Sequence, residues 1–154
     1  MLVTGAQMIS VLLVDDHAFV LRSLKYLIAT TDDIQVGATA SNGVEAVSQA
    51  SLQCPNVVVI DIAMPLMNGI EAARKILFLC PLTRVMMISM FDTPEYIHQA
   101  LDVGALGYVL KDEAINDLLS GIRALSRGTH FFSQKISGIA EKYLHLKGTD
   151  GRVV

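Results

Sequence analysis

Residues 57–72 read VVVIDIAMPLMNGIEA, and the order of apolar, acidic and turn residues here indicates the fold class. The first four residues are all apolar, as in a β-strand that is buried on both faces of a sheet. Asp61 ends the apolar run, and Pro65 and Gly69 mark the turn that follows. An amphipathic stretch then begins at Ile70. A buried strand, a turn and a helix in this order predict one unit of a parallel α/β sheet.

The same alternation repeats from Ser10 to about Arg127 and gives five βα units. Strands are predicted at residues 11–14, 34–40, 57–60, 85–88 and 107–110. Helices are predicted at residues 18–29, 44–52, 70–79, from 94 onward, and 114–126, with Asn42, Asn68 and Thr93 as caps. We therefore predict an α/β fold: a doubly wound, five-stranded parallel sheet with five flanking helices. Beyond Gly128, residues 134–146 are predicted to form one more amphipathic helix and residues 147–154 a frayed tail.

Length and composition limit the classes of protein to which the chain can belong. The 154 residues suit one domain with a short extension, and 52% are hydrophobic. No apolar run approaches the roughly 18 residues that span a bilayer, so we expect no membrane partner. The net charge of −3 argues against nucleic-acid binding by this chain alone. Residues 1–10 lack the features of a signal peptide, and we predict a cytoplasmic protein.

The cysteines and histidines show no metal-binding spacing. Cys54 and Cys80 each precede a proline, and we expect two separate thiols that serve as packing residues in a reducing compartment. The four histidines are scattered too widely in sequence to form a local motif, and we expect surface or helix-face residues at His17, His98, His130 and His145.

Charged and hydroxyl side chains close four of the predicted strands. They are Asp15, Asp16, Asp61, Ser89 and Lys111. The carboxyl ends of parallel strands meet at one edge of a doubly wound sheet, so these side chains are expected to lie together. Two carboxylates about 4 Å apart repel by about 4 kcal/mol at an effective dielectric of about 20, and three of them require a cation. Mg²⁺ prefers such oxygen ligands, and Lys111 supplies a second positive centre.

This arrangement predicts a phosphoryl acceptor. An aspartate can attack phosphorus to form an aspartyl phosphate, here on Asp61. Lys111 would neutralise charge, Ser89 would bind a phosphoryl oxygen, and Tyr108 would rotate into the space that Ser89 leaves. Taken singly, each residue also fits a plain role as a helix cap, turn residue, loop hydroxyl or solvated charge. Their joint placement at the ends of strands favours the functional interpretation.

Four motifs resemble the receiver domain of bacterial two-component response regulators over residues 10–127. They read VLLVDDH, VVVIDIAMPLMNGIEA, VMMISMFD and GALGYVLKDEA. The resemblance implies a flavodoxin-like sheet of order 2-1-3-4-5 and a sensor histidine kinase as the phosphodonor. It implies that Asp61 is the phosphoacceptor and that Mg²⁺ is bound by Asp61, by Asp16 directly, by Asp15 through water and by the carbonyl of Ala63.

The motif GTHFFS after the last predicted helix is similar to the NarL/LuxR-type subfamily of transcriptional regulators. That resemblance implies a DNA-binding helix-turn-helix domain after a linker, and homodimerisation on phosphorylation. We expect a tail at residues 1–9, a receiver domain at 10–127 and a linker at 128–154, with the DNA-binding domain absent from this chain. We favour an excised receiver, because residues 134–146 resemble the linker helix of that subfamily. The alternative is a stand-alone receiver that acts as a phosphorelay or protein-interaction module.

We expect a signalling switch that catalyses only its own phosphorylation and slow autodephosphorylation. Fast receivers often carry an amide or acid two residues after the phosphoacceptor or after the hydroxyl residue, whereas Ala63 and Phe91 stand here. Met90 is expected to shield the phosphate further. A rival interpretation is a phosphatase of the haloacid dehalogenase type, but that family needs a second aspartate where Ala63 stands.

Overall fold

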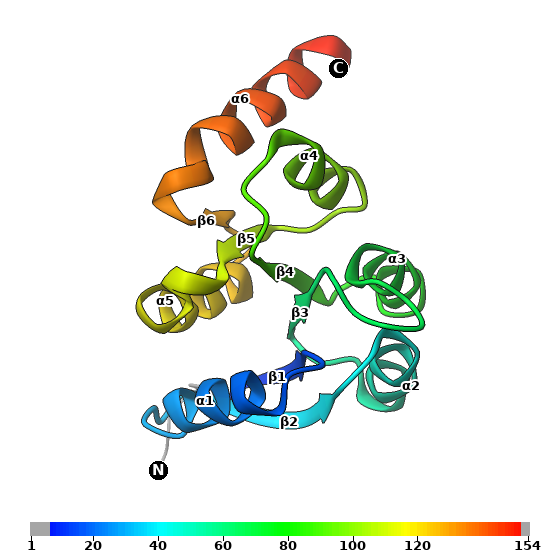
Figure 1. The fold of residues 1–154 in the computed structure, drawn as a ribbon, viewed down its shortest axis with the longest axis vertical. Helices are drawn as coiled ribbons and strands as arrows, with labels where there is room; N and C mark the ends of the chain where they lie inside the picture. Colours follow the sequence, from blue (N-terminus) through cyan, green and yellow to red (C-terminus); the bar gives the residue numbers. More distant parts are fainter. Residues whose placement is uncertain (1–6, 152–154) are drawn as a thin grey trace.

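A computed structural model describes residues 7–151 and shows one parallel sheet between two layers of helices (Figure 1). Its strand order is β2-β1-β3-β4-β5-β6, and every neighbouring pair is parallel. The strands are β1 (Ile9–Val14), β2 (Ile34–Ala40), β3 (Val57–Asp61), β4 (Arg84–Ser89), β5 (Gly107–Leu110) and β6 (Phe131–Phe132). The doubly wound α/β prediction and its five strands are confirmed. The sixth strand was not predicted, because two residues are too few to show a periodic pattern.

Helices cover both faces of the sheet. They are α1 (Ala18–Ile28), α2 (Gly43–Gln53), α3 (Gly69–Leu79), α4 (Pro94–Asp102), a 3₁₀ turn η1 (Lys111–Glu113), α5 (Ala114–Ser126) and α6 (Gln134–Gly151). Helices α1 and α5 cover one face, α2, α3 and α4 cover the other, and α6 extends away beside α4 (Figure 1). Asn42 and Asn68 accept the expected capping hydrogen bonds from Glu45 and Glu71. Thr93 occupies the N-cap position of α4, but its side chain makes no capping hydrogen bond, contrary to prediction.

The core has two halves, one on each face of the sheet. Successive residues of a strand point to opposite faces, so β1 sends Leu12 and Val14 toward α2–α4 and sends Val11 and Leu13 toward α1 and α5. All four side chains are at most 2% exposed. Strands β1, β3 and β4 are therefore mostly apolar and buried on both faces, whereas β2 also carries Gln35 and Thr39.

Helix α6 continues beyond its predicted end at residue 146, and it reaches Gly151. The prediction of a frayed tail from residue 147 is thus wrong as far as Gly151, and residues 152–154 lie outside the described part of the chain. Within this extra part of the helix, Nζ of Lys147 donates to Asp102 of α4 at 3.1 Å. None of the helices within residues 7–151 has the length and apolar character needed to cross a bilayer.

Cys54 and Cys80 form a disulfide, so the expectation of two separate thiols is wrong. The two residues follow directly after α2 and α3, and these helices pack side by side. Their Cα atoms are 5.5 Å apart, within the range of about 4.4–6.8 Å that a disulfide requires. The bond joins the carboxyl-terminal ends of the two helices, at the edge of the sheet opposite Asp61.

Candidate functional site at the carboxyl edge of the sheet

Four parallel strands bring the predicted site residues to one edge of the sheet. Asp15 directly follows β1, Asp61 and Ser89 are the last residues of β3 and β4, and Lys111 directly follows β5. In the register of the sheet, Asp61 pairs with Ile88, one residue before Ser89. Ser89 pairs with Leu110, one residue before Lys111. Side chains that are far apart in the sequence therefore meet at the ends of neighbouring strands.

Lys111 joins two buried carboxylates. Its Nζ lies 2.9 Å from Oδ2 of Asp15 and 3.2 Å from Oδ2 of Asp61. Asp15 is 1% exposed and Asp61 is 4% exposed. One ammonium thus faces two negative charges from which water is largely excluded. Because a buried charge is stable only when it is paired, this group of three keeps an excess negative charge that attracts a further cation.

Burial and charge shift the acid–base properties of this group. Burial raises the pKa of Asp61, the negative charge of Asp15 raises it further, and Lys111 only partly offsets these effects. Burial lowers the pKa of Lys111, but its hydrogen bond to Asp15 and the charges of both carboxylates outweigh burial, and the pKa is raised overall. Lys111 is therefore a permanent cation near neutral pH. Burial and the charge of Asp15 thus destabilise the ionised form of Asp61, and a bound cation would stabilise it.

A cluster of possible metal ligands surrounds Asp61. One ligand atom from each of Asp15, Asp16, His17 and Asp61 lies within 4.8 Å of the others. His17 Nδ1 is 3.0 Å from Asp15 Oδ1 and 3.2 Å from Asp16 Oδ1. His17 was not predicted to join the site, although its position directly after Asp15 and Asp16 was the available signal. The three carboxylates are hard oxygen ligands, and the donor set fits a divalent cation such as Mg²⁺.

The two acidic residues do not cap α1 through their side chains. His17 occupies the N-cap position of α1 and makes no side-chain capping bond. Asp15 Oδ1 instead accepts a hydrogen bond from the backbone N of His17 at 2.9 Å, which orients the carboxylate within the site. The alternative that Asp15 and Asp16 serve only to cap α1 is thus not supported by the structure.

The loop from β3 to α3 is shaped by close backbone contacts. A Cβ atom at Gly69 would overlap the carbonyl oxygen of Asp61, so the start of α3 can approach the strand only with glycine there. The backbone N of Gly69 donates to the carbonyl of Ile62 at 2.8 Å. Leu66 has φ of 71°, a conformation that is uncommon for a residue with a side chain. These contacts bring the start of α3 close to the backbone of Asp61.

Ser89 and Tyr108 are linked through Phe91. The backbone N of Phe91 donates to Ser89 Oγ at 2.9 Å, and the hydroxyl of Tyr108 donates to the carbonyl of Phe91 at 2.6 Å. Ser89 and Tyr108 are both 0% exposed, and burial raises the pKa of Tyr108 to about 12. The ring of Phe91 stacks on Tyr96 of α4 with centroids 4.2 Å apart. The ring of Tyr108, which was predicted to rotate inward, is already buried in this structure.

The remaining predicted residues lie at the rim. The backbone N of Ala63 is 3.4 Å from Asp61 Oδ1, a long hydrogen bond, and its side chain offers no acid or amide. A haloacid dehalogenase mechanism therefore has no general acid at this position. Met90 is 78% exposed. Its side chain does not pack over Asp61 as a fixed cover.

The sequence resembles known regulatory proteins. Residues 11–123 match the family described as the response regulator receiver domain. The chain is 36% identical over 124 residues to the transcriptional regulatory protein YxjL of Bacillus subtilis, and the match covers 80% of this chain and 57% of that protein. It is 31% identical over 142 residues to the oxygen regulatory protein NreC of Staphylococcus carnosus, covering 91% and 65%. The chain thus spans about three fifths of the length of these relatives.

Solved structures share the fold. A LuxR-family two-component response regulator from Aurantimonas superposes with a TM-score of 0.83 at 28% identity, covering 90% of this chain and 99% of that one. The response regulator domain of Thermotoga maritima CheB gives a TM-score of 0.73 at 33% identity, covering 79% and 98%. The Salmonella RcsB structure, at 24% identity and a TM-score of 0.79, supports the fold alone.

Proposed function

The chain belongs to the family of response regulator receiver domains, and we propose that it accepts a phosphoryl group on Asp61 in a Mg²⁺-dependent reaction. The observation that carries the proposal is the pairing of Lys111 Nζ with both Asp15 and Asp61 beside a third carboxylate, Asp16. The phosphodonor would be the phosphohistidine of a sensor kinase. The result is a signalling switch that catalyses only its own phosphorylation and slow autodephosphorylation.

The proposed transfer is a displacement at phosphorus. A carboxylate oxygen of Asp61 forms a bond to phosphorus while the bond between phosphorus and the donor nitrogen breaks, and the electron pair of that bond stays on the nitrogen. Lys111 lies close enough to pair with an oxygen of the incoming group. The hydroxyl of Ser89, once that residue moves toward Asp61, would donate to another phosphoryl oxygen. Positioning and charge stabilisation account for the catalysis.

A divalent cation at this site would neutralise phosphoryl oxygens and carboxylates together. Asp16, Asp15 and Asp61 would hold it through their carboxylates, with the backbone carbonyl of Ala63 as a further ligand. This donor set fits Mg²⁺ because it offers hard oxygen atoms and leaves room for water. Asp15 and Asp61 would then keep their charges without the full cost of mutual repulsion.

The output of the switch is proposed to be transcriptional. YxjL is named a transcriptional regulatory protein, and this chain covers 57% of that relative. We propose that residues 10–127 form the receiver and that residues from 128 onward form a linker to a DNA-binding domain in a cytoplasmic regulator, which homodimerises on phosphorylation. The alternative is a receiver that acts alone as a relay. An encoded reading frame that continues past Val154 into a helix-turn-helix domain would favour the first proposal.

The phosphoryl group is proposed to be long-lived. Neither Ala63 nor Phe91 offers a side chain that could orient an attacking water. We expect autodephosphorylation to take minutes or longer, measured as decay of the phosphorylated mass after the phosphodonor is removed. Loss of the phosphoryl group within seconds would contradict this part of the proposal. The variant Ala63→Asn should shorten the lifetime.

Intact-mass measurement with Mg²⁺ and acetyl phosphate tests the proposal. We expect the mass of one phosphoryl group on the unmodified chain, no adduct on Asp61→Asn, and no adduct when Mg²⁺ is removed by a chelator. Asp32→Asn is a matched control, because Asp32 is an aspartate of the loop between α1 and β2, outside the acidic cluster. An unchanged adduct on Asp61→Asn would overturn the proposal.

A further inference from the structure

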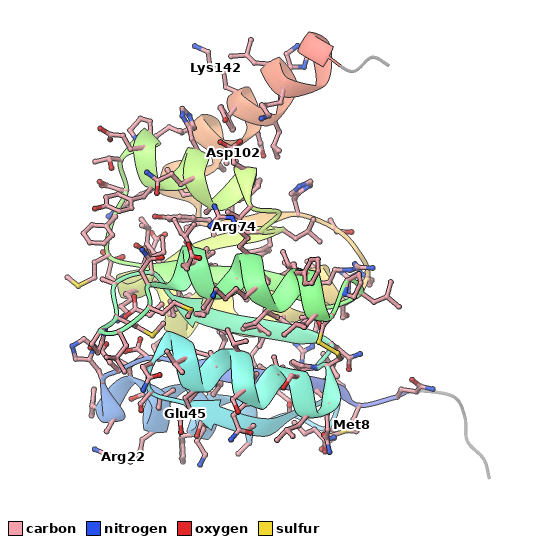
Figure 2. The ribbon with its side chains drawn as sticks, turned by 90° about the vertical axis from the view of Figure 1, so that its right-hand side faces the viewer. Met8, Arg22, Glu45, Arg74, Asp102 and Lys142 are labelled. Atoms are coloured by element: carbon pink, nitrogen blue, oxygen red, sulfur yellow. A yellow bond between two sulfur atoms is a disulfide. The ribbon has the colours of Figure 1, made fainter. Side chains whose placement is uncertain are left out.

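Helix α6 is attached to α4 by four polar and aromatic side chains. Tyr143 Oη donates to Asp102 Oδ1 at 2.7 Å, and Lys147 Nζ donates to the same oxygen at 3.1 Å. The ring of Tyr143 stacks on His98 of α4 with centroids 3.9 Å apart and planes 13° apart. Figure 2 shows Asp102 where α6 passes α4, whereas Lys142 points away from α4. We call His98, Asp102, Tyr143 and Lys147 the α4–α6 clasp.

The electrostatics of the clasp agree with its geometry. The hydrogen bond from Tyr143 lowers the pKa of Asp102, and the pKa of Tyr143 is raised by the same bond. The hydrogen bond to Asp102 raises the pKa of Lys147. Asp102 therefore carries its charge near neutral pH and holds both partners. Because the clasp is exposed, its bonds are weak enough to open and re-form.

The first half of α6 is anchored more deeply than the clasp. Ile136 and Ala140 are 1% and 0% exposed and belong to the same core cluster as Ile97 of α4 and Tyr108 of β5. Just before α6, the backbone N of Ser133 donates to the carbonyl of Tyr108 at 3.0 Å. The segment after α5 therefore touches both the helix next to the site and the strand that carries Tyr108.

Direct contacts connect the phosphoryl-acceptor site to α4. Ser89 holds the backbone N of Phe91, and the ring of Phe91 stacks on Tyr96 in the first turn of α4. The hydroxyl of Tyr108 holds the carbonyl of Phe91. A movement of Ser89 toward Asp61 must either break the bond to Phe91 or pull this residue along. A movement that pulls Phe91 along changes its packing against Tyr96 and, with it, the position of α4.

We propose that the α4–α6 clasp reports the state of Asp61: it is closed in the unphosphorylated chain and opens when Asp61 is phosphorylated. This inference rests on the proposed function. Opening would leave α6 anchored at Ile136 and Ala140 and free its second half from Asp102 and His98. Whatever follows α6 in a longer chain would then change its position relative to the receiver. The device converts a charge placed on Asp61 into a movement of the linker.

The ring stack in the clasp gives a direct readout by NMR. A proton of the His98 imidazole above the Tyr143 ring resonates upfield of an unstacked histidine, and the signal is assigned by its absence in His98→Asn. The signal position in Tyr143→Leu defines the open clasp. With Mg²⁺ and beryllofluoride, a stable stand-in for the phosphoryl group, we expect the His98 signal of the unmodified chain to move most of the way to that position. The same addition to Asp61→Asn should change nothing.

Thermodynamic reciprocity supplies a second test. If phosphorylation opens the clasp, then variants that open it must favour the phosphorylated state by the same factor. We expect Tyr143→Leu and Lys147→Gln to bind beryllofluoride and Mg²⁺ about 5-fold more tightly or better, the lower end of the usual range for coupled sites. Lys142→Gln, an exposed residue of the same helix outside the clasp, is the matched control and should bind as the unmodified chain does.

The outcomes separate the two proposals. Absence of any beryllofluoride binding, with Mg²⁺ present, would overturn the proposed function and this inference together. Binding of beryllofluoride with an unmoved His98 signal would leave the proposed function in place and overturn the clasp proposal. Equal affinities for Lys147→Gln and Lys142→Gln would overturn it as well, because the clasp would then be uncoupled from Asp61.

Discussion

Reduction of the bond between Cys54 and Cys80 is expected to destabilise the domain without disabling the phosphoryl-acceptor site. The disulfide closes a loop with a sequence separation of 26 residues and so restricts the unfolded chain. In the chain-entropy model, a loop of this length contributes about 3.5 kcal/mol to the free energy of unfolding. For a protein of this size, each kcal/mol corresponds to about 2–4 °C in Tm, so the expected loss is about 7–14 °C.

Thermal unfolding followed by circular dichroism measures this effect. Oxidised protein is compared with protein kept in a phosphine reductant, and Cys54→Ser serves as the control because it cannot form the bond. Cys54 is the more exposed partner, whereas Cys80 is 2% exposed, so the serine replacement changes little packing. We expect Cys54→Ser to unfold at the temperature of the reduced protein, with or without reductant.

Phosphorylation should be unaffected by reduction, because the bond lies at the opposite edge of the sheet from Asp61. Mass measurement with an alkylating reagent should find no free thiols in protein prepared without reductant, and two free thiols would contradict the disulfide. A Tm that reduction left unchanged would contradict its expected contribution to stability.

Four substitutions probe the site, its surroundings and helix α6. Burial raises the folded-state pKa of Asp61 above its ordinary value of 3.8, so the charge of Asp61 opposes folding above that raised pKa. Without metal at pH 7, Asp61→Asn should therefore have a larger free energy of unfolding than the unmodified chain. Urea titrations should show this advantage disappear below about pH 3.8, where the carboxyl is protonated in both states, and an advantage that grew on acidification would contradict the sign. Tyr108→Phe removes the hydrogen bond to the carbonyl of Phe91 and should lower the free energy of unfolding by about 1–3 kcal/mol in the same urea titration. An unchanged urea midpoint would show that this carbonyl finds another donor. Gly69→Ala should lower the free energy of unfolding by about 1–3 kcal/mol or more and slow phosphorylation, because its Cβ would overlap the backbone of Asp61. Gly138→Ala meets open space in α6 and should raise the free energy of unfolding by about 0.5–1 kcal/mol. Equal effects of the two substitutions would contradict the structure.

The predictable part of this molecule follows from apolar runs and strand ends. Residues 57–60 form an apolar run typical of a strand buried on both faces, and the same holds for most of β1 and β4. Once these strands are parallel, their carboxyl ends must share an edge, which is why the meeting of Asp61 with Lys111 could be foreseen 50 residues apart in the sequence. The caps at Asn42 and Asn68 were equally local, since each asparagine bonds to a residue three positions on.

The features that escaped prediction depend on contacts between elements. Strand β6 has two residues and exists because Phe131 and Phe132 pair with β5. The disulfide requires α2 and α3 to end side by side, which the spacing of Cys54 and Cys80 does not reveal. The extension of α6 brings Lys147 to Asp102 of α4, a contact between elements that the sequence alone does not reveal.

The most direct test of the central claim is to locate the phosphoryl group on the chain. The protein is incubated with Mg²⁺ and acetyl phosphate, the acyl phosphate is reduced with borohydride, and peptides are sequenced by mass spectrometry. We expect conversion of Asp61 to homoserine, with every other aspartate unchanged. An unmodified Asp61 in protein that carries the phosphoryl mass, or modification at Asp15 or Asp16 instead, would contradict this expectation.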